Sequence, residues 1–276
     1  MSTTEETPPG VFSSLKSKLK KQFTPNESQS DTTFWLLGTL QLIFLVLLWE
    51  LWRAPTIPGT VGVLTAFVNL VQTYDFWEGL FSSLTLAMCS LLAATAISLT
   101  LSYSYAIPFM RPMVTLFTKF RFFALLGLTI VPRILFEGSF KIRLSLLVFG
   151  VSVYFATGMM AVVRDIPRKR FEYLQTLGKT DWQVFWEIVV IETIPHAFEN
   201  MRQNNAITFT LLPLVEVISR TGGGLGMMMW DSKKYGGPVA TFAMELVLLL
   251  IGVCLDHLIK KGRLAACPHL EKKKGH

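Results

Sequence analysis

The sequence predicts an all-α integral membrane protein with about six transmembrane helices. Hydrophobic residues make up 51% of its 276 residues and charged residues only 16%, a balance that is unusual for a soluble domain of this size. Long apolar stretches alternate with short polar ones, and the basic residues gather between and outside the apolar stretches. Much of the apolar surface must therefore face lipid, since about 20 consecutive apolar residues cross a bilayer as a helix.

Four apolar stretches are long enough to cross the hydrocarbon core on their own. They are residues 34–52, the middle of 79–110, 144–163 and 236–255. The third and fifth spans are less apolar, because Arg121 and Arg133 flank the third, and Glu199, Arg202 and Glu216 lie in the fifth. Both spans are expected nevertheless, since six crossings return the chain to the side on which it began.

The distribution of Lys and Arg predicts the orientation. With a cytoplasmic N-terminus, 18 of these residues lie inside and seven outside, and such an excess marks the cytoplasmic side of a membrane protein. Both termini and residues 164–179 are therefore predicted to be cytoplasmic, and residues 56–75 and 221–235 to be external.

Three regions follow from this pattern: a cytoplasmic N-terminal tail (1–33), a transmembrane domain (34–259) and a basic cytoplasmic C-terminal tail (260–276). Within the first tail, residues 10–23 predict either an amphipathic helix on the membrane surface or a solvated basic segment. Residues 1–10 are acidic and polar and lack the apolar core of a secretory signal peptide, so the first span is expected to be retained.

Several functions are not expected from this composition. The three cysteines and four histidines show no ligand or pairing spacing, so neither a metal site nor a disulfide framework is predicted. The net charge of +7 is not accompanied by interleaved aromatic residues, so nucleic-acid binding is not expected. Residues 221–226 are rich in glycine but lack the Lys of a phosphate loop. We expect no catalytic residue and no cofactor, and the chain is not expected to be an enzyme.

The segment between the fourth and fifth spans, residues 164–195, is too long and too patterned for a simple turn. Phe171, Leu174 and Leu177 share one helical face. Gly178 is suited to end that helix in a left-handed conformation, and Thr180 or Asp181 to cap the next one. An apolar face at the cytoplasmic surface needs a cover of lipid or of a partner protein.

This segment resembles the cytoplasmic signature loop of binding-protein-dependent ABC transporter permeases. The resemblance rests on Glu172-Tyr-Leu-Gln-Thr-Leu-Gly178, followed by Trp182-Gln183 and Pro195. The family signature runs Glu-Ala-Ala, three residues, Gly, and later Leu-Pro; here Tyr173 and Leu174 replace the alanines and Ile194 replaces the Leu.

The similarity extends over residues 56–261 and is closest to the nitrate, sulfonate, taurine and bicarbonate group of these permeases. Arg202, Glu216 before Gly224-Leu-Gly226, and Gly252 with Asp256 match positions in that group. One departure is clear: residues 121–138 are shortened and lack the double-proline stretch of those relatives.

The resemblance implies a MetI-like permease fold and a subunit of an ATP-driven importer in the bacterial cytoplasmic (inner) membrane. It implies four kinds of partner: lipid, two ABC ATPase subunits, a second permease chain, expected to be an identical copy, and an extracytoplasmic solute-binding protein. The solute would be small, such as the anions nitrate, sulfonate or bicarbonate. Coupling to the ATPase would fall to Arg168, Arg170, Phe171, Glu172, Leu174, Gly178 and Pro195.

Polar groups inside spans are candidates for the solute path, because burying a charge in hydrocarbon costs about 2.5 to 3.5 kcal/mol or more. These candidates are Arg202, Asn204, Asn205, Glu216 and Glu245. Each also has a plainer interpretation, in which, for example, Arg202 reaches the cytoplasmic interface and Glu216 the external one. An ion-gradient-driven secondary transporter stays open as an alternative, although it gives no reason for the 172–195 loop. A non-transporting membrane scaffold stays open if the shortened third span leaves no path.

Overall fold

The computed structural model describes residues 31–52, 58–220 and 222–266. All regular secondary structure in these ranges is helical. The chain separates into two compact units, residues 1–60 and 61–276. The surface helix expected within residues 10–23 and the end of the basic tail, 267–276, lie outside the described residues.

The first unit contains one described helix, α2 (Asp31–Leu51). Residues 32–51 are apolar enough to cross a membrane, and none of the side chains in that span is buried within the described structure. Such a helix is suited to lipid on all sides, and it coincides with the first predicted span.

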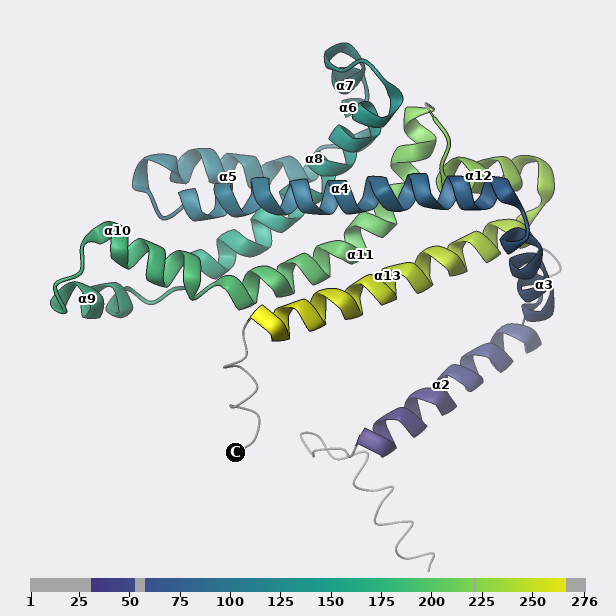
Figure 1. The fold of residues 1–276 in the computed structure, drawn as a ribbon, viewed down its shortest axis with the longest axis horizontal. Coiled ribbons are helices and arrows are strands. Elements are labelled where there is room, and N and C mark those ends of the chain that lie inside the picture. Colours follow the sequence, from purple (N-terminus) through teal and green to yellow (C-terminus); the bar gives the residue numbers. More distant parts are fainter. Residues whose placement is uncertain (1–30, 53–57, 221, 267–276) are drawn as a thin grey trace, which may run out of the picture. The chain divides into compact units, whose positions relative to one another are not determined.

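The second unit holds all the remaining helices (Figure 1). Its α-helices are α3 (Thr60–Val71), α4 (Tyr74–Ser104), α5 (Arg111–Lys119), α6 (Leu125–Leu128), α7 (Ile130–Leu135), α8 (Ser139–Arg164), α9 (Arg168–Thr176), α10 (Asp181–Val184), α11 (Ile194–Ser219), α12 (Leu225–Asp231) and α13 (Pro238–Ala266). Short 3₁₀ segments cover Pro108–Met110 and Phe120–Phe122, and π-helical segments cover Phe185–Ile191 and Ser232–Gly236.

Four long helices, α4, α8, α11 and α13, form the core of this unit. Serines let α4 and α8 approach closely: Ser98 Oγ donates to the Ser152 carbonyl at 2.8 Å and Ser102 Oγ to the Ala156 carbonyl at 3.2 Å. Helix α11 packs against both α8 and α13. Leucine, valine and alanine side chains from these helices fill the space between them. The all-α membrane fold expected from the sequence is therefore confirmed.

The third predicted span is not a single straight helix. Residues 108–122 and 125–135 meet at an angle of 108°. The bend lies at Phe123 and Ala124, whose backbones are extended, directly after a 3₁₀ turn. Arg121 lies beside this break, and its side chain is exposed. Among the described helices, four are long and apolar enough to cross a membrane, and five if the bent pair counts as one span.

Several helices are longer than the apolar stretches that predicted them. Helix α4 begins at Tyr74 and α8 at Ser139, each five residues before the apolar stretch that predicted it. Asp75 lies in the first turn of α4, where the helix dipole favours a negative charge. Helix α13 runs on to Ala266, so the predicted C-terminal tail begins within a helix. Hydropathy predicts only the apolar part of a helix that can face lipid. The backbone hydrogen bonds of these helices continue beyond that part into their polar ends.

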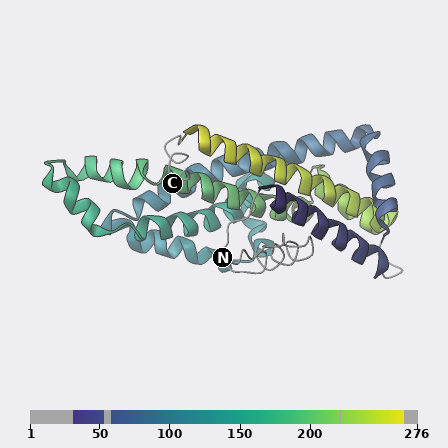
Figure 2. The same cartoon turned by 90° about the horizontal axis from the view of Figure 1, so that it is seen from below.

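The two polar ends of the second unit are separated by the length of its helices. Figures 1 and 2 show the turn of α9 and α10 at one end and α3 at the other, with α12 near α3. Residues 164–179 and 222–235 thus lie at opposite ends, as the predicted topology requires.

Candidate functional site

Helices α9 and α10 form a turn that joins α8 to α11 (Figure 1). Helix α9 ends where Gly178 adopts a φ of 79°, a left-handed conformation that is unfavourable for residues with a side chain by about 1 kcal/mol or more. The Lys179 amide then donates to the Leu174 carbonyl at 3.3 Å. The predicted conformation of Gly178 is confirmed, and its role in coupling stays a prediction.

The start of α10 is fixed by side chains. The Thr180 amide donates to Gln183 Oε1 at 3.0 Å as part of a capping box, which satisfies backbone groups that the helix leaves open. Gln175 Nε2 of α9 donates to Asp181 Oδ1 at 2.8 Å and ties the two helices together. The cap predicted at Thr180 is therefore present.

Residues 185–191 continue from α10 as a π-helix. The Glu192 amide donates to the Glu187 carbonyl five residues earlier, at 3.1 Å. π-helical turns are rare and often occur at functional positions. This one lies between the α9 turn and the start of α11.

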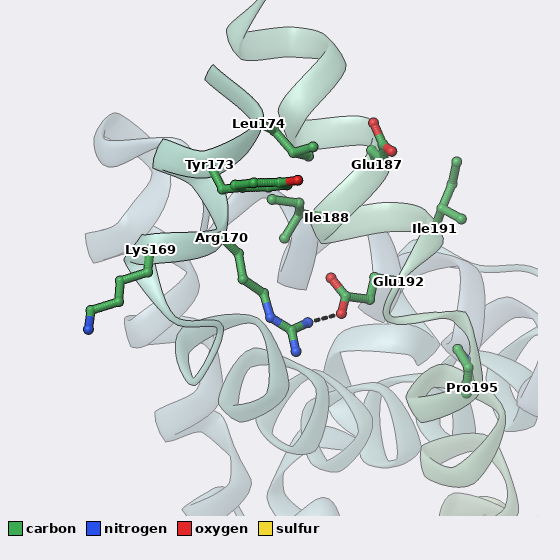
Figure 3. Close-up of a pocket in the computed structure, with 9 residues that line it drawn as sticks. All are labelled: Lys169, Arg170, Tyr173, Leu174, Glu187, Ile188, Ile191, Glu192 and Pro195. Atoms are coloured by element: carbon green, nitrogen blue, oxygen red, sulfur yellow. Dashed lines mark ion pairs between the residues drawn. The ribbon is translucent and has the colours of Figure 1, made fainter. Parts of the chain in front are cut away.

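A pocket of about 590 Å³ opens between α9 and the π-helix (Figure 3). Its lining combines apolar and charged side chains: Lys169, Arg170, Tyr173, Leu174, Glu187, Ile188, Ile191, Glu192 and Pro195. In Figure 3 the ring of Tyr173 and the side chain of Leu174 lie beside Ile188. These three side chains form an apolar floor in the pocket, and the floor is open to the outside, since Tyr173 is 65% exposed. This surface is therefore suited to receive an apolar group of a partner.

Charged pairs frame this pocket. Arg170 of α9 forms an ion pair with Glu192, drawn as a dashed line in Figure 3. Lys179 pairs with Glu187 on the other side. Both pairs connect the α9 turn to the segment that leads into α11.

Of the seven predicted coupling residues, three line this pocket: Arg170, Leu174 and Pro195. Arg168 and Glu172 are exposed on α9, and Phe171 is half-buried. Gly178 lies beyond the pocket at the turn.

Sequence reasoning missed a second groove, of about 890 Å³, beside the first. It is lined by Lys179, Trp182, Gln183, Phe185, Trp186, Glu187 and Ile191. Trp182 and Trp186 are 70% and 60% exposed. Their spacing of four residues places them on one helical face, and that spacing was the available signal.

At the same end of the unit, charged residues join α11 to α13. Arg202 Nη2 lies 2.6 Å from Glu199 Oε1, and its Nη1 lies 3.2 Å from Asp256 Oδ1. Arg263 Nη1 lies 2.9 Å from Glu199 Oε2. Arg202, a predicted path residue, is thus bound to two carboxylates.

Asn205 and Glu245, two other predicted path residues, both line a groove between α11 and α13 of about 490 Å³. Asn205 is buried and its Nδ2 donates to the Gly252 carbonyl at 3.0 Å. Glu245 is exposed on α13. Asn204 is buried too, but its Nδ2 donates within α11, to the Asn200 carbonyl, and it does not line this groove.

Glu216, the remaining candidate, is fully buried in a polar cluster at the opposite end. Its carboxylate accepts from Ser83 Oγ at 2.7 Å and from the Gly226 amide at 2.6 Å, and Arg143 Nη1 lies 3.9 Å away. Ser83 Oγ in turn accepts from the Leu225 amide at 2.8 Å. The cluster holds the start of α12 against α4, α8 and α11.

Gly224 explains why the sequence here is so rich in glycine. Its φ is 147°, and a Cβ at this position would meet the Glu216 carboxylate. A side chain at Gly226 would lie 2.6 Å from Pro213 Cα. These glycines allow the chain to pass close to a carboxylate of its own.

Comparison with known proteins agrees with this fold. No family model matches the chain. It is 24% identical to the taurine transport system permease protein TauC of Escherichia coli K12 over 234 residues, which cover 82% of this chain and 81% of the relative.

Among solved structures, the chain is similar to a bacterial ABC transporter involved in the import of the acidic polysaccharide alginate. The TM-score is 0.54 at 17% identity, over 91% of this chain and 98% of the other. An amino acid ABC transporter gives a TM-score of 0.51 at 17% identity, over 71% and 95% of the two chains. The resemblance found in the 172–195 loop is therefore confirmed: the chain has the transmembrane fold of ABC importer permeases and is similar in sequence to one permease of the nitrate, sulfonate, taurine and bicarbonate group.

Proposed function

We propose that this chain is the permease subunit of an ABC importer in the bacterial inner membrane, driven by two separate ATPase subunits. The observation that carries the proposal is the α9–α10 turn, which presents an exposed apolar pocket framed by charge at one end of the long helices. An ATPase side chain inserted between Tyr173 and Ile188 would cover that apolar surface.

Movement of the ATPase pair would reach the membrane through this turn. Arg170 and Glu192 link α9 to the residues that precede α11, so a push on α9 is passed directly to α11. Helix α11 packs on α8 and α13 and would tilt against them. This is the physical basis proposed for switching the solute path from outside to inside.

A second permease chain, proposed to be an identical copy, would face α11 and α13. Glu245 is exposed within the apolar part of α13, residues 238–255, and a carboxylate facing lipid would cost several kcal/mol. A path between two chains gives it water or a partner instead. Asn205 and Glu245 are accordingly proposed to line that path, and Arg202 to stand beside its cytoplasmic end.

A solute-binding protein is proposed to dock at the α3 and α12 end. One similar solved structure is of a bacterial alginate ABC transporter in complex with a pentasaccharide-bound periplasmic protein, with a TM-score of 0.51 at 16% identity. Similarity to the sulfonate and nitrate group supports a small solute of that class.

The test is retention of an ATPase through pairs of matched variants. Tyr173 at the pocket and Tyr235 at the opposite end are both exposed, by 65% and 76%. Tyr173→Asp should lose the co-purifying ATPase, and Tyr235→Asp should keep it. Equal retention by both variants would show that the α9 pocket is not the docking site.

Reconstitution separates the alternatives. In liposomes without the ATPase, the chain should show no ATP-dependent uptake. Uptake driven by a proton or sodium gradient in that preparation would establish a secondary transporter instead. A scaffold would transport nothing even with the ATPase and binding protein added.

A further inference from the structure

The face of α11 that packs on α8 uses its polar side chains within α11 itself. Asn200, Asn204 and Thr208 share this face, because a spacing of four residues nearly completes one helical turn. Gly158 of α8 lies so close that an added Cβ would meet Asn200 Oδ1. Asn200 Nδ2 donates to the His196 carbonyl at 3.1 Å. Asn204 Nδ2 donates to the Asn200 carbonyl and Thr208 Oγ1 to the Asn204 carbonyl, both at 2.8 Å. Since these hydrogen bonds stay inside one helix, α11 can slide along α8 without breaking them.

The opposite face of α11 bonds across to α13. Arg202 Nη1 lies 3.2 Å from Asp256 Oδ1, and Asn205 Nδ2 donates to the Gly252 carbonyl at 3.0 Å. Phe209 packs directly on Gly252, where an added Cβ would lie 3.6 Å from Phe209 Cγ. These contacts follow one another over about two turns of α11, and together they fasten this segment to α13.

Arg202 is the centre of this joint. Besides Asp256 it contacts Glu199, one turn earlier in α11, at 2.6 Å. Glu199 in turn lies 2.9 Å from Arg263 of α13. The chain of charges therefore begins and ends on α13 and passes through α11. Its four side chains are between 31% and 36% exposed, and ion pairs that water reaches contribute little to folding stability. The network is better suited to hold the two helices in place than to stabilise the fold.

Toward its last turn, α11 is bound to α4 and α8 instead. Glu216 accepts a hydrogen bond from Ser83 of α4, and Arg143 of α8 lies beside it. Helices α4 and α8 are fastened to each other by the hydrogen bonds of Ser98 and Ser102. Helix α11 thus has a fixed point on α4 and α8 near residue 216, and a joint with α13 near residue 202.

We propose that Arg202 is a positioning residue for transport. By binding Glu199 and Asp256 it fastens this part of α13 to α11, so a push that arrives from α9 moves the two helices together past α8. The joint fixes the place about which α11 tilts against α13, and the Glu216 cluster fixes the point about which it swings on α8. The inference rests on the proposed function, since the push comes from the bound ATPase. It gives Arg202 a mechanical role in place of contact with the solute.

The test measures helix movement in the full chain with its ATPase, reconstituted in lipid nanodiscs. The native cysteines are first replaced by alanine, at Cys89, Cys254 and Cys267. Spin labels are then attached at exposed positions in two pairs. One pair joins Thr100→Cys of α4 to Gln203→Cys of α11, and the other joins Thr100→Cys to Lys260→Cys of α13. Each distance is measured by electron paramagnetic resonance without nucleotide and after trapping with ATP and vanadate.

Trapping should change both distances in the chain that retains Arg202. Arg202→Gln should keep the change between α4 and α11 and lose most of the change between α4 and α13, and Asp256→Asn should do the same. Arg202→Lys, which keeps the charge, should retain both changes. Lys261→Gln removes an exposed charge from α13 outside the network, so it is the matched control and should also retain both.

A change between α4 and α13 that survives both Arg202→Gln and Asp256→Asn would overturn the proposal. So would a movement confined to α11 while Arg202 is present, or no movement at all with the ATPase bound. Loss of both changes together in Arg202→Gln would overturn it too, because a purely structural role predicts that result. Retention of the ATPase is measured on the same preparation: a chain with Arg202 that retains none would overturn the proposed function, and this inference with it.

Discussion

Arg170 on α9 forms an ion pair with Glu192, the residue that directly follows the π-helix. Both side chains are about half exposed, at 56% and 46%, and exposed ion pairs contribute only about 0 to 1 kcal/mol to folding. The pair is therefore suited to fix the position of α9 relative to α11 without greatly stabilising the protein.

Reversing this pair gives the first prediction. Arg170→Glu and Glu192→Arg should each lower ATP-dependent uptake several-fold, because like charges would push α9 away from the start of α11. The double variant should recover part of the uptake, and no variant should lower the free energy of unfolding by more than about 1 kcal/mol. Uptake by the double variant as low as by the single ones would exclude the pair as the connection.

The second prediction concerns Gly178. A Cβ at this position would meet nothing within 4 Å, so a substitution acts only through the backbone conformation. Gly178→Val should cost about 1 kcal/mol or more at the turn and reduce uptake, with the chain still inserted in the membrane. Gly178→Asn is the matched control, because Asn tolerates left-handed conformations, and it should retain more uptake than the Val variant. Equal uptake by both would show that the turn does not depend on this conformation.

Labelling tests the topology. Thr176 of α9 and Tyr235 of the π-helical segment after α12 are both exposed, and Figure 1 shows α9 and α12 at opposite ends of the second unit. In a cysteine-free background, an impermeant thiol reagent added to sealed cells should label Tyr235→Cys and leave Thr176→Cys unlabelled until the membrane is opened. Labelling of Thr176→Cys in sealed cells would contradict a cytoplasmic α9.

The Glu216 cluster gives a prediction on stability. Glu216→Ala would leave Arg143 and Ser83 buried without their carboxylate partner, and breaking a buried pair in this way costs about 3 to 5 kcal/mol. Thermal unfolding in detergent should show a clearly lower Tm. Glu216→Gln, which keeps an oxygen for the Gly226 amide, should lose less. Glu137→Ala, an exposed glutamate near the same end, serves as the control and should leave the Tm unchanged.

The fold was predictable from the sequence where one local signal decided the structure. Apolar length marked α2, α4, α8 and α13, and the left-handed preference of glycine marked the end of α9 at Gly178. The bend at Phe123 was not predictable, because neither glycine nor proline marks it and only the tertiary fold selects the extended backbone there.

The site was predictable only in part. The sequence neighbours of Glu216 are apolar, so hydropathy indicates a single polar residue within a span. It does not show whether that residue faces a solute path or the protein core. Its partners Ser83 and Arg143 come from distant helices, at separations that no local pattern reports. Asn205 and Glu245 line one groove for the same reason, through the packing of α11 on α13.

The π-helix between α10 and α11 affects what kind of motion can pass along this route. Its hydrogen bonds reach one residue further than those of an α-helix, so one residue more is wound into each turn. If one wide turn tightened to α geometry, everything after it would rotate by about 100° around the helix axis, the angle that one residue subtends. Under the proposed coupling, a change of the segment Phe185–Ile191 between π and α geometry would pass force on α9 to α11 as a rotation in place of a simple push.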